Sequence, residues 1–400
     1  MNNQKILIVT ECFYPEQFNI NELAHSWQDR GYDVDVLTLF PSYPAGQIFS
    51  GYKNKLFSKE IYKGITIYRV YAVTGYKDNK FKKLLKYINF MTLGSIVAAL
   101  IGRKYDYIFG FNLGALTDMV PAVVIRKLYK KPLMFWVQDV WPDAVYAYGF
   151  KKTKILAWFL NIFVKFIFHN ISSIAISGKG FEHKLKPYVK ENLDFNYLPN
   201  WAIKLNMSQE GINLSTKPMD HFTFAGNIGS AQNLENIINA FNLLSPEYSK
   251  KAQLNIFGDG SSLSILKEIS GKNDHIVFHG MKPQNQMAKF LKASNFLIVS
   301  LVDDPIFSVT VPAKTQTYIA AKKPILAIIN GDTADIIREN NLGLCVDPSN
   351  VELICTTFQD CIDMTEVERI SFVKNNEEVL DTIFNKENII NDLTKILVQQ

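Results

Sequence analysis

The residues with the clearest capacity for chemistry lie in one stretch, Phe222 to Gln232. A short apolar strand ends at Gly226 and Gly229, which allow positive φ and a close approach of a ligand to the backbone. A helix beginning near Asn233 would point its free N–H groups and its dipole at an anion. The stretch therefore predicts a phosphate cradle. Two glycines at a strand-to-helix turn can also serve packing alone, and the motif by itself leaves this alternative open.

Carboxylates follow other predicted strands. Asp139 and Asp143 come directly after an apolar run at 133–136. Asp139 could orient a hydroxyl nucleophile or accept its proton. Asp residues also cap helices, and we favour that role for Asp143. Glu11 and Glu16 lie on the loop after the first strand, where they could contact an acceptor.

The cysteines show no metal-binding pattern. None of the four forms a Cys-x-x-Cys pair, and no His cluster joins them. We therefore expect neither a metal site nor a disulfide framework, as is usual in a reducing compartment. The apolar run after Lys5 is too short for a signal peptide, so we expect a cytoplasmic protein.

Strands and helices alternate along the chain, which predicts parallel α/β sheets. The first half has apolar runs at 5–10, 32–39, 105–112, 133–136 and 172–177. After the strand that leads to Gly226, the second half has further runs at 254–257, 276–278, 296–300 and 324–328, with helical patterns between them. Each strand is expected to end in a turn at the same edge of its sheet. Ligands bind at that edge in parallel α/β sheets. A length of 400 residues favours two domains.

Charge is divided unevenly. Residues 1–200 hold 26 Lys and Arg against 15 Asp and Glu, while the overall net charge is +5. Two segments, Lys77–Lys104 and Phe150–His169, set lysines beside aromatic and aliphatic residues. This mixture suits an anionic lipid interface and argues against nucleic acid. Both segments could instead be core helices with a solvated basic edge. The apolar run 88–101 is shorter than a membrane span needs.

The order of several motifs resembles that of the family 4 retaining glycosyltransferases, and the likeness covers nearly the whole chain. A shorter likeness points to the O-antigen and capsule branch, and within it to enzymes that transfer N-acetyl-L-fucosamine from UDP. The family motifs are Arg30-Gly31-Tyr32-Asp33-Val34, Phe224 to Gly229, Phe257-Gly258-Asp259-Gly260, Phe278-His279-Gly280 and Val311-Pro312-Ala313-Lys314; the branch motifs are Trp136 to Asp143 and Leu198-Pro199-Asn200-Trp201.

The resemblance implies a GT-B fold, with two Rossmann-like parallel-sheet domains facing across a cleft. It implies retention at the anomeric carbon, no metal requirement, and catalytic roles for Asp139 and Lys314. The implied nucleotide-sugar site comprises Gly226, Asn227, Ile228, Gly229, Gln232, Gly258, Asp259, Gly280, Met281, Val311, Pro312 and Thr317. The implied acceptor side comprises Glu11, Phe13, Asn19 and Gln138.

The sequence departs from the family at four charged positions. Relatives carry two glutamates where this chain has Val309 and Thr317, and an Arg and a Lys where it has Asn227 and Gln232. Lys314 remains as the nearest cation. A lysine at a helix start interacts unfavourably with the positive end of the helix dipole. A charge at such an unfavourable position favours a functional role for Lys314. We interpret the replacements as a trait of the branch.

We expect an acceptor-binding, membrane-associating domain at 1–200 and a nucleotide-sugar domain at 201–375. Residues 376–400 are expected as a helix, for which packing back onto the first domain is one alternative. The predicted function is transfer of an N-acetylated deoxyhexosamine from UDP to a polyprenyl-diphosphate-linked glycan, at the inner face of the cell membrane. A UDP-sugar 2-epimerase and a non-catalytic nucleotide-sugar-binding subunit are the alternatives.

Overall fold

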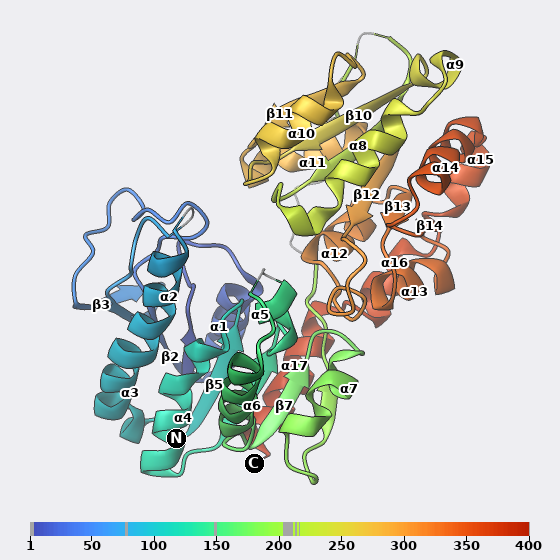
Figure 1. Cartoon of the computed structure of the whole chain (residues 1–400). Helices are drawn as coiled ribbons and strands as arrows, with labels where there is room; N and C mark the ends of the chain where they lie inside the picture. The colour runs from blue at the N-terminus through green and yellow to red at the C-terminus, as the bar shows by residue number, and fades with distance from the viewer. Residues whose placement is uncertain are drawn as a thin grey trace. The chain divides into compact units, whose positions relative to one another are not determined.

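The chain folds as two compact units, which Figure 1 colours from blue to red along the sequence. The computed structural model describes residues 4–76, 79–147, 150–202, 211–212, 214–215 and 217–399. The first unit comprises 1–199 together with 387–400, and the second comprises 200–386. Residues 206–210, 213 and 216, which fall in the polar stretch 206–220 before the glycine-bearing strand, lie outside the described residues, as does Lys77 at the start of the first basic segment.

The first unit is built on an eight-stranded sheet that is parallel except for one terminal hairpin. Its order across the sheet is β3 (Phe57–Tyr62), β4 (Ile65–Val70), β2 (Asp33–Leu39), β1 (Lys5–Thr10), β5 (Tyr107–Asn112), β6 (Leu133–Val137), β7 (Ser173–Ile176) and β8 (Phe195–Tyr197). β1 lies at the centre, with Ile8 paired to Val36 of β2 and to Phe109 of β5. The chain leaves β1 toward β2 and later returns to the other side at β5. The reversal creates a topological switch point at the carboxyl end of β1.

Helices cover both faces of this sheet. Figure 1 shows α4 (Val120–Tyr129) and α6 (Lys154–Phe168) in front of it, with α1 (Asn19–Asp29) and α17 (Lys386–Val398) behind. Trp27 on α1 is fully buried, and its indole N–H donates to Thr394 on α17 at 2.8 Å. The last helix therefore belongs to the core of the first unit. Two shorter helices, α5 (Asp143–Ala147) and α7 (Phe181–Leu185), follow β6 and β7.

The segment 376–400 is two helices, and they belong to different units. α16 (Asn376–Thr382) contributes Val379 to an apolar core cluster of the second unit. α17 begins at Lys386, at the boundary between the units. The expected single C-terminal helix thus gives way to one helix on each unit.

The second unit holds a six-stranded parallel sheet. Its order is β11 (Ile276–Gly280), β10 (Ala252–Phe257), β9 (Asp220–Ala225), β12 (Phe296–Ser300), β13 (Ile325–Ile328) and β14 (Gly343–Val346). The chain turns from β9 toward β10 and returns on the other side at β12. This unit has its own switch point, at the carboxyl end of β9.

Two apolar clusters cover the faces of the second sheet. One joins α8 (Leu234–Asn242), α10 (Leu263–Ser270) and α14 (Val351–Asp363) to the sheet, with the Phe222 and Phe358 rings 4.9 Å apart. The other gathers α11 (Gln284–Ala293), α12 (Ala313–Ala320) and α13 (Asp332–Glu339). α9 (Pro246–Ser249) and α15 (Glu366–Ser371) complete the described helices of this unit. The predicted fold of two parallel-sheet α/β domains is confirmed.

A continuous helical run connects β4 to β5. It consists of α2 (Lys80–Asn89), a π-helical turn at Phe90–Gly94, α3 (Ser95–Ile101) and a 3₁₀ turn at Gly102–Lys104. Among the described helices, the 21-residue part Leu84–Lys104 is long and apolar enough to cross a membrane by length and composition. The apolar run 88–101, which is itself shorter than a membrane span, thus lies within a longer helical run.

Candidate functional site

The glycine-bearing turn of the second unit lies at its switch point, between β10 and β12. Gly226 and Gly258 follow β9 and β10 with φ of 153° and 138°, in the region that favours glycine. The Gly226 N–H donates to Phe257 O at 3.0 Å, and a Cβ at Gly258 would clash with the Gly226 carbonyl oxygen. The two turns therefore cross at a distance that only glycine permits at position 258.

Lys314 brings a cationic side chain to this turn from a neighbouring helix. It lies in the first turn of α12, and one helical turn later the Tyr318 hydroxyl accepts from the Ala225 N–H at 2.9 Å. This bond anchors α12 against the end of β9. The Lys314 ammonium lies 3.9 Å from the Phe224 ring centroid and donates to Gln232 Oε1 at 2.6 Å. It would be 3.4 Å from a Cβ at Gly226.

Burial against Phe224 lowers the pKa of the Lys314 ammonium to about 7. Desolvation favours the neutral amine, and the group it contacts here, Gln232, is an uncharged amide. An anion placed beside Gly226 would supply the missing counter-charge. The ammonium is thus positioned to gain interaction energy from a phosphate group.

The backbone N–H groups of the predicted cradle residues are of two kinds: some are paired within the protein and others are not. The Ile228 N–H donates to Asp259 O at 2.9 Å and its side chain is fully buried. The Ile228 N–H is therefore paired within the protein and does not serve as a donor to a ligand. The N–H groups of Asn227 and Gly229 have no acceptor within the described part of the chain. Those two amides remain as donors for an anion.

The remaining predicted donor-side residues lie on neighbouring turns. Gly280 ends β11 with φ of 65°, and its carbonyl accepts from the Gly258 N–H at 3.0 Å. Met281 follows it, 68% exposed. Asp259 is also exposed, and Val311 and Pro312 are half-buried just before α12. The Thr317 hydroxyl donates to Ala313 O within its own helix at 3.2 Å.

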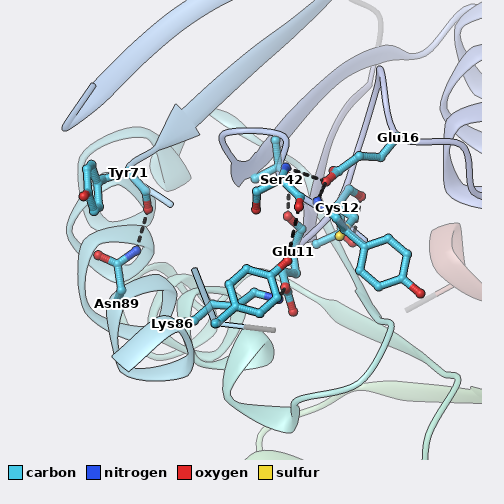
Figure 2. A network of polar contacts seen from close by, with 11 residues as sticks. Glu11, Cys12, Glu16, Ser42, Tyr71, Lys86 and Asn89 are labelled. Atoms are coloured by element: carbon cyan, nitrogen blue, oxygen red, sulfur yellow. Dashed lines mark hydrogen bonds and ion pairs between the residues drawn. The ribbon is translucent and has the colours of Figure 1, made fainter. Parts of the chain in front are cut away.

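The switch point of the first unit carries a different chemistry, a cluster of buried charged groups (Figure 2). Glu11 follows β1 and forms an ion pair with Lys86 on α2, and both side chains are less than a tenth exposed. The Lys86 ammonium also lies 4.3 Å from the Tyr76 ring centroid. Asp118, 1% exposed, hydrogen-bonds to Glu11 from the segment after β5.

Burial shifts the titration of this cluster. Desolvation and the neighbouring Glu11 charge raise the pKa of Asp118 well above its usual range, so the Asp118 carboxyl can donate to Glu11. Burial and nearby carboxylates likewise raise the pKa of the Cys12 thiol. The pKa of Tyr87 is raised by burial, then by the charges of Glu11, Asp118 and Asp139. Asp139 is therefore within electrostatic reach of the same region.

Sequence reasoning missed Lys86 and Asp118. Lys86 was counted with the basic segment rather than with the site, because its inward direction depends on the phase of α2. Asp118 lies in a 3₁₀ turn, Leu116–Met119, where no helical or strand period marks it. The spacing of Glu11 and Asn112 at the ends of adjacent strands was the one available signal for a polar group between them.

The predicted acceptor-side residues divide between the core and the sheet edge. Phe13 is fully buried and packs in the core, so its side chain cannot face an acceptor as predicted. Asn19 begins α1 and is half-buried. The Gln138 N–H donates to Asn112 Oδ1 at 3.1 Å. Asp139 Oδ1 accepts from the Val140 N–H at 3.0 Å, which leaves its cap and acceptor roles both compatible with the geometry.

Glu16, also named for this loop, has a structural role. Its Oε1 accepts from the backbone N–H groups of Ser42 and Tyr43 at 2.9 and 2.7 Å. Desolvation nevertheless raises its pKa. Glu16 fastens the loop after β1 to the loop after β2 (Figure 2) and is 5% exposed, so it is not solvated.

Residues 220–363, which contain the glycine turn, α8 and α12, match the family model described as glycosyl transferases group 1. Over these residues the second unit is therefore similar to the group 1 glycosyltransferases. Among the described residues, no group of three or more His, Cys, Asp or Glu side chains could hold a metal ion.

Two curated relatives and one solved structure extend the match. The probable glycosyltransferase WbjE of Pseudomonas aeruginosa is 27% identical over 62% of this chain and 64% of its own length, just under two thirds of that protein. WcaI of Escherichia coli (strain K12), described as a colanic acid biosynthesis glycosyl transferase, is 21% identical over 96% of this chain and 98% of its own. Anabaena Alr3699/HepE, solved with UDP and glucose, has a TM-score of 0.68 and 12% identity over the full length of both chains. The architecture is the GT-B glycosyltransferase fold.

The structure shows where the departures of this chain from the expected family pattern lie. Gln232, where we expected a cation in relatives, accepts the hydrogen bond of Lys314. The cation beside Gly226 thus comes from α12 rather than from the turn itself. Val309 is half-buried in the loop after β12, and Thr317 lies on α12, so neither replaces a carboxylate.

Proposed function

We propose that the protein is a retaining family 4 glycosyltransferase that takes its donor as a UDP-sugar in the second unit. The observation that carries this proposal is the close crossing of the Gly226 and Gly258 turns beside the Lys314 ammonium. The geometry offers two backbone N–H donors and one cation at a topological switch point, where ligands bind in such sheets. The UDP bound to the HepE structure supports the choice of nucleotide.

The proposed chemistry uses these donors as the leaving group departs. The bond between the anomeric carbon and the diphosphate breaks, and negative charge grows on the phosphate oxygen. The Lys314 ammonium and the N–H groups of Asn227 and Gly229 would stabilise that charge, the electrostatic contribution that usually dominates catalysis. With a pKa of about 7 in the free protein, Lys314 would become fully charged when the diphosphate binds beside it.

The first unit would hold the acceptor hydroxyl. Asp139 is proposed to orient this hydroxyl and to accept its proton as the hydroxyl oxygen forms the new bond to the anomeric carbon. Asn19 and Gln138 would contact other acceptor hydroxyls from the same sheet edge. Glu11 would act through its pair with Lys86, since both groups are buried.

The finer identity of the substrates rests on sequence likeness. We propose an N-acetylated deoxyhexosamine donor, with N-acetyl-L-fucosamine as the best candidate, and a polyprenyl-diphosphate-linked glycan as acceptor in O-antigen or capsule synthesis. The described role of WcaI in colanic acid biosynthesis supports a polysaccharide product. A lipid-linked acceptor would place the reaction at the inner face of the cell membrane, with the enzyme bound peripherally.

Heat protection followed by transfer tests the proposal. The full chain is heated with UDP and with a panel of UDP-sugars; a bound ligand raises the apparent melting temperature. The protecting sugar is then supplied with lipid-diphosphate glycan acceptors, and transfer is followed by mass spectrometry. We expect protection by one UDP-sugar and transfer that drops about 100-fold or more in Asp139→Asn. An Asp143→Asn variant, changed at the neighbouring helix, should retain transfer.

Other outcomes decide between the alternatives. Protection without transfer to any acceptor would favour a non-catalytic nucleotide-sugar-binding subunit. Interconversion of the sugar without transfer would favour the 2-epimerase. The structure gives that alternative little support, because His279 Nε2 donates to Asn255 Oδ1 at 2.8 Å and its ring stacks on Phe257.

A further inference from the structure

Helix α6 is apolar on two opposite faces, but only one face is covered. Leu160, Val164, Ile167 and Phe168 are buried against the sheet, with Phe168 and Phe135 rings 5.5 Å apart. The outer face exposes a second stripe at helical spacing. Its members, 38% to 82% exposed, are Ile155, Trp158, Phe159, Ile162 and Phe166. A helix with apolar residues all round is normally buried on all sides, so this outer stripe lacks a cover.

The run α2–α3 also has an exposed apolar stripe, and it lies on the same face of the sheet as α4 and α6 (Figure 1). The Lys127 ammonium of α4 is 4.8 Å from the Phe166 ring centroid of α6, so these helices are neighbours. The outer apolar side chains of α2–α3 lie on one helical stripe that includes the adjacent pair Leu84 and Leu85. They are 38% to 78% exposed: Phe81, Leu84, Leu85, Ile88, Ile96 and Leu100.

The charge around these stripes has one sign. No Asp or Glu occurs anywhere in 80–104 or in 144–181. The exposed side chains at the start of α6 and on its outer surface include Lys151, Lys152, Lys154 and Lys165, and α2 adds Lys82. An apolar stripe with Trp and Phe, edged by lysines and free of acids, is complementary to anionic headgroups above an acyl layer.

We propose that the outer stripes of α6 and α2–α3 dock on the surface of an anionic lipid bilayer. The surface lies on the bilayer and does not cross it. The inner face of the α2–α3 run is fixed to α4: Phe90 and Ala98 are fully buried, and a Cβ at Gly94 would be 3.0 Å from Pro121. A spanning helix would have to leave those contacts. The proposal about this surface rests on the exposure and the charge of its side chains. It does not depend on the proposed transfer reaction.

Flotation of the full chain with vesicles tests the surface. The probes are phosphatidylcholine vesicles and vesicles of phosphatidylcholine with phosphatidylglycerol. We expect flotation with the anionic vesicles only, weakened by salt, which screens exposed charges. Combined replacement of Lys151, Lys152 and Lys154 by Gln should weaken partitioning about 100-fold at low salt. Combined replacement of Ile155, Trp158 and Ile162 by Ser should weaken it by more than about tenfold.

Matched controls come from exposed residues of the second unit. The lysine control replaces Lys250, Lys267 and Lys272 by Gln, and the apolar control replaces Leu353, Val367 and Ile370 by Ser; all six side chains are exposed. Both controls should float like the parent. Circular dichroism of the α6 variants checks that they fold, which is expected because the altered side chains point away from the core.

Trp158 gives a second readout that separates insertion from simple charge attraction. It is 66% exposed, while Trp27, Trp136 and Trp201 are buried. Its fluorescence should move to shorter wavelength on binding, and brominated lipid should quench it; Trp158→Phe should lose both signals and still float. Flotation without a Trp158 signal, or equal flotation of the two α6 variants and the parent, would overturn the proposal. A parent that ignores vesicles and forms a dimer, lost in the Ser variant, would assign the surface to a second copy instead.

Discussion

The two units use the same topological device for opposite chemistry. In both, the central strand ends where the chain reverses direction across a parallel sheet. In the first unit this point holds Glu11, Lys86 and Asp118, three charged or titratable side chains removed from water. In the second it holds Gly226 and Gly258, whose missing side chains let two turns cross, with Lys314 as a neighbouring cation.

The difference indicates which groups fix the geometry of each site. Burying an ion pair costs desolvation free energy. We infer that the buried pair of Glu11 and Lys86 is retained because the geometry of the neighbouring residues depends on it. The glycine turn keeps its donors in the backbone, so its geometry depends on main-chain conformation. Substitutions should therefore act through charge in the first unit and through backbone strain or the single cation in the second.

The largest effect is expected from breaking the buried pair. Lys86→Met should lower the free energy of unfolding of the first unit by about 3–5 kcal/mol, because it leaves Glu11 buried and unpaired. Urea unfolding followed by tryptophan fluorescence reports on this unit, which contains Trp27, Trp136, Trp141 and Trp158. Lys82→Met, on the exposed side of the same helix, is the control and should stay within about 0.5 kcal/mol.

A double change sharpens the same test. Adding Glu11→Gln to Lys86→Met should recover part of the lost stability, since no buried charge is then left unpaired. Additive losses in the double variant would mean that the two groups do not depend on each other.

The second unit should respond to backbone strain. Gly258→Ala should cost about 2–3 kcal/mol, because alanine at φ of 138° is strained and its Cβ meets the Gly226 carbonyl. Gly229→Ala is the comparison, since its Cβ would meet the end of the Asn227 side chain, which can move. Equal unfolding midpoints for the two alanine variants by circular dichroism would contradict the role of the crossing turns.

The lowered pKa of Lys314 predicts a pH-dependent stability. The unfolded chain holds the Lys314 proton up to about pH 10, whereas the folded chain holds it only up to about pH 7. The resulting loss in the free energy of unfolding is therefore complete below pH 7 and becomes smaller as the pH rises. Allowing for solvent screening of this half-buried side chain, the parent should gain roughly 1–2 kcal/mol relative to Lys314→Met between pH 6 and pH 9. Parallel pH profiles for the two proteins would contradict the shift.

The smallest effect is expected at Thr317. Its hydroxyl already donates to Ala313 O, so Thr317→Ala should change UDP affinity by less than about threefold. A tenfold loss in calorimetry would show that this hydroxyl contacts the ribose, in place of the glutamate expected in relatives.

The sequence was sufficient for the fold and for one side of the candidate site. Buried parallel strands such as β1 and β12 appear as continuous apolar runs, and their turns predict which edge binds ligands. The hairpin β3–β4 was missed because β3 is a half-exposed terminal strand of mixed composition. Lys86 and Asp118 could not be assigned, since their partner depends on which way a helix and a short turn face in three dimensions.

UDP binding measured by calorimetry, with uridine as the reference ligand, tests the central claim most directly. The account predicts that the parent binds UDP far more tightly than uridine at pH 7, and that Lys314→Met loses about 1.5–3 kcal/mol for UDP with uridine unchanged. Equal losses for both ligands, or unaltered UDP affinity in Lys314→Met, would contradict a diphosphate held beside Gly226 by this lysine.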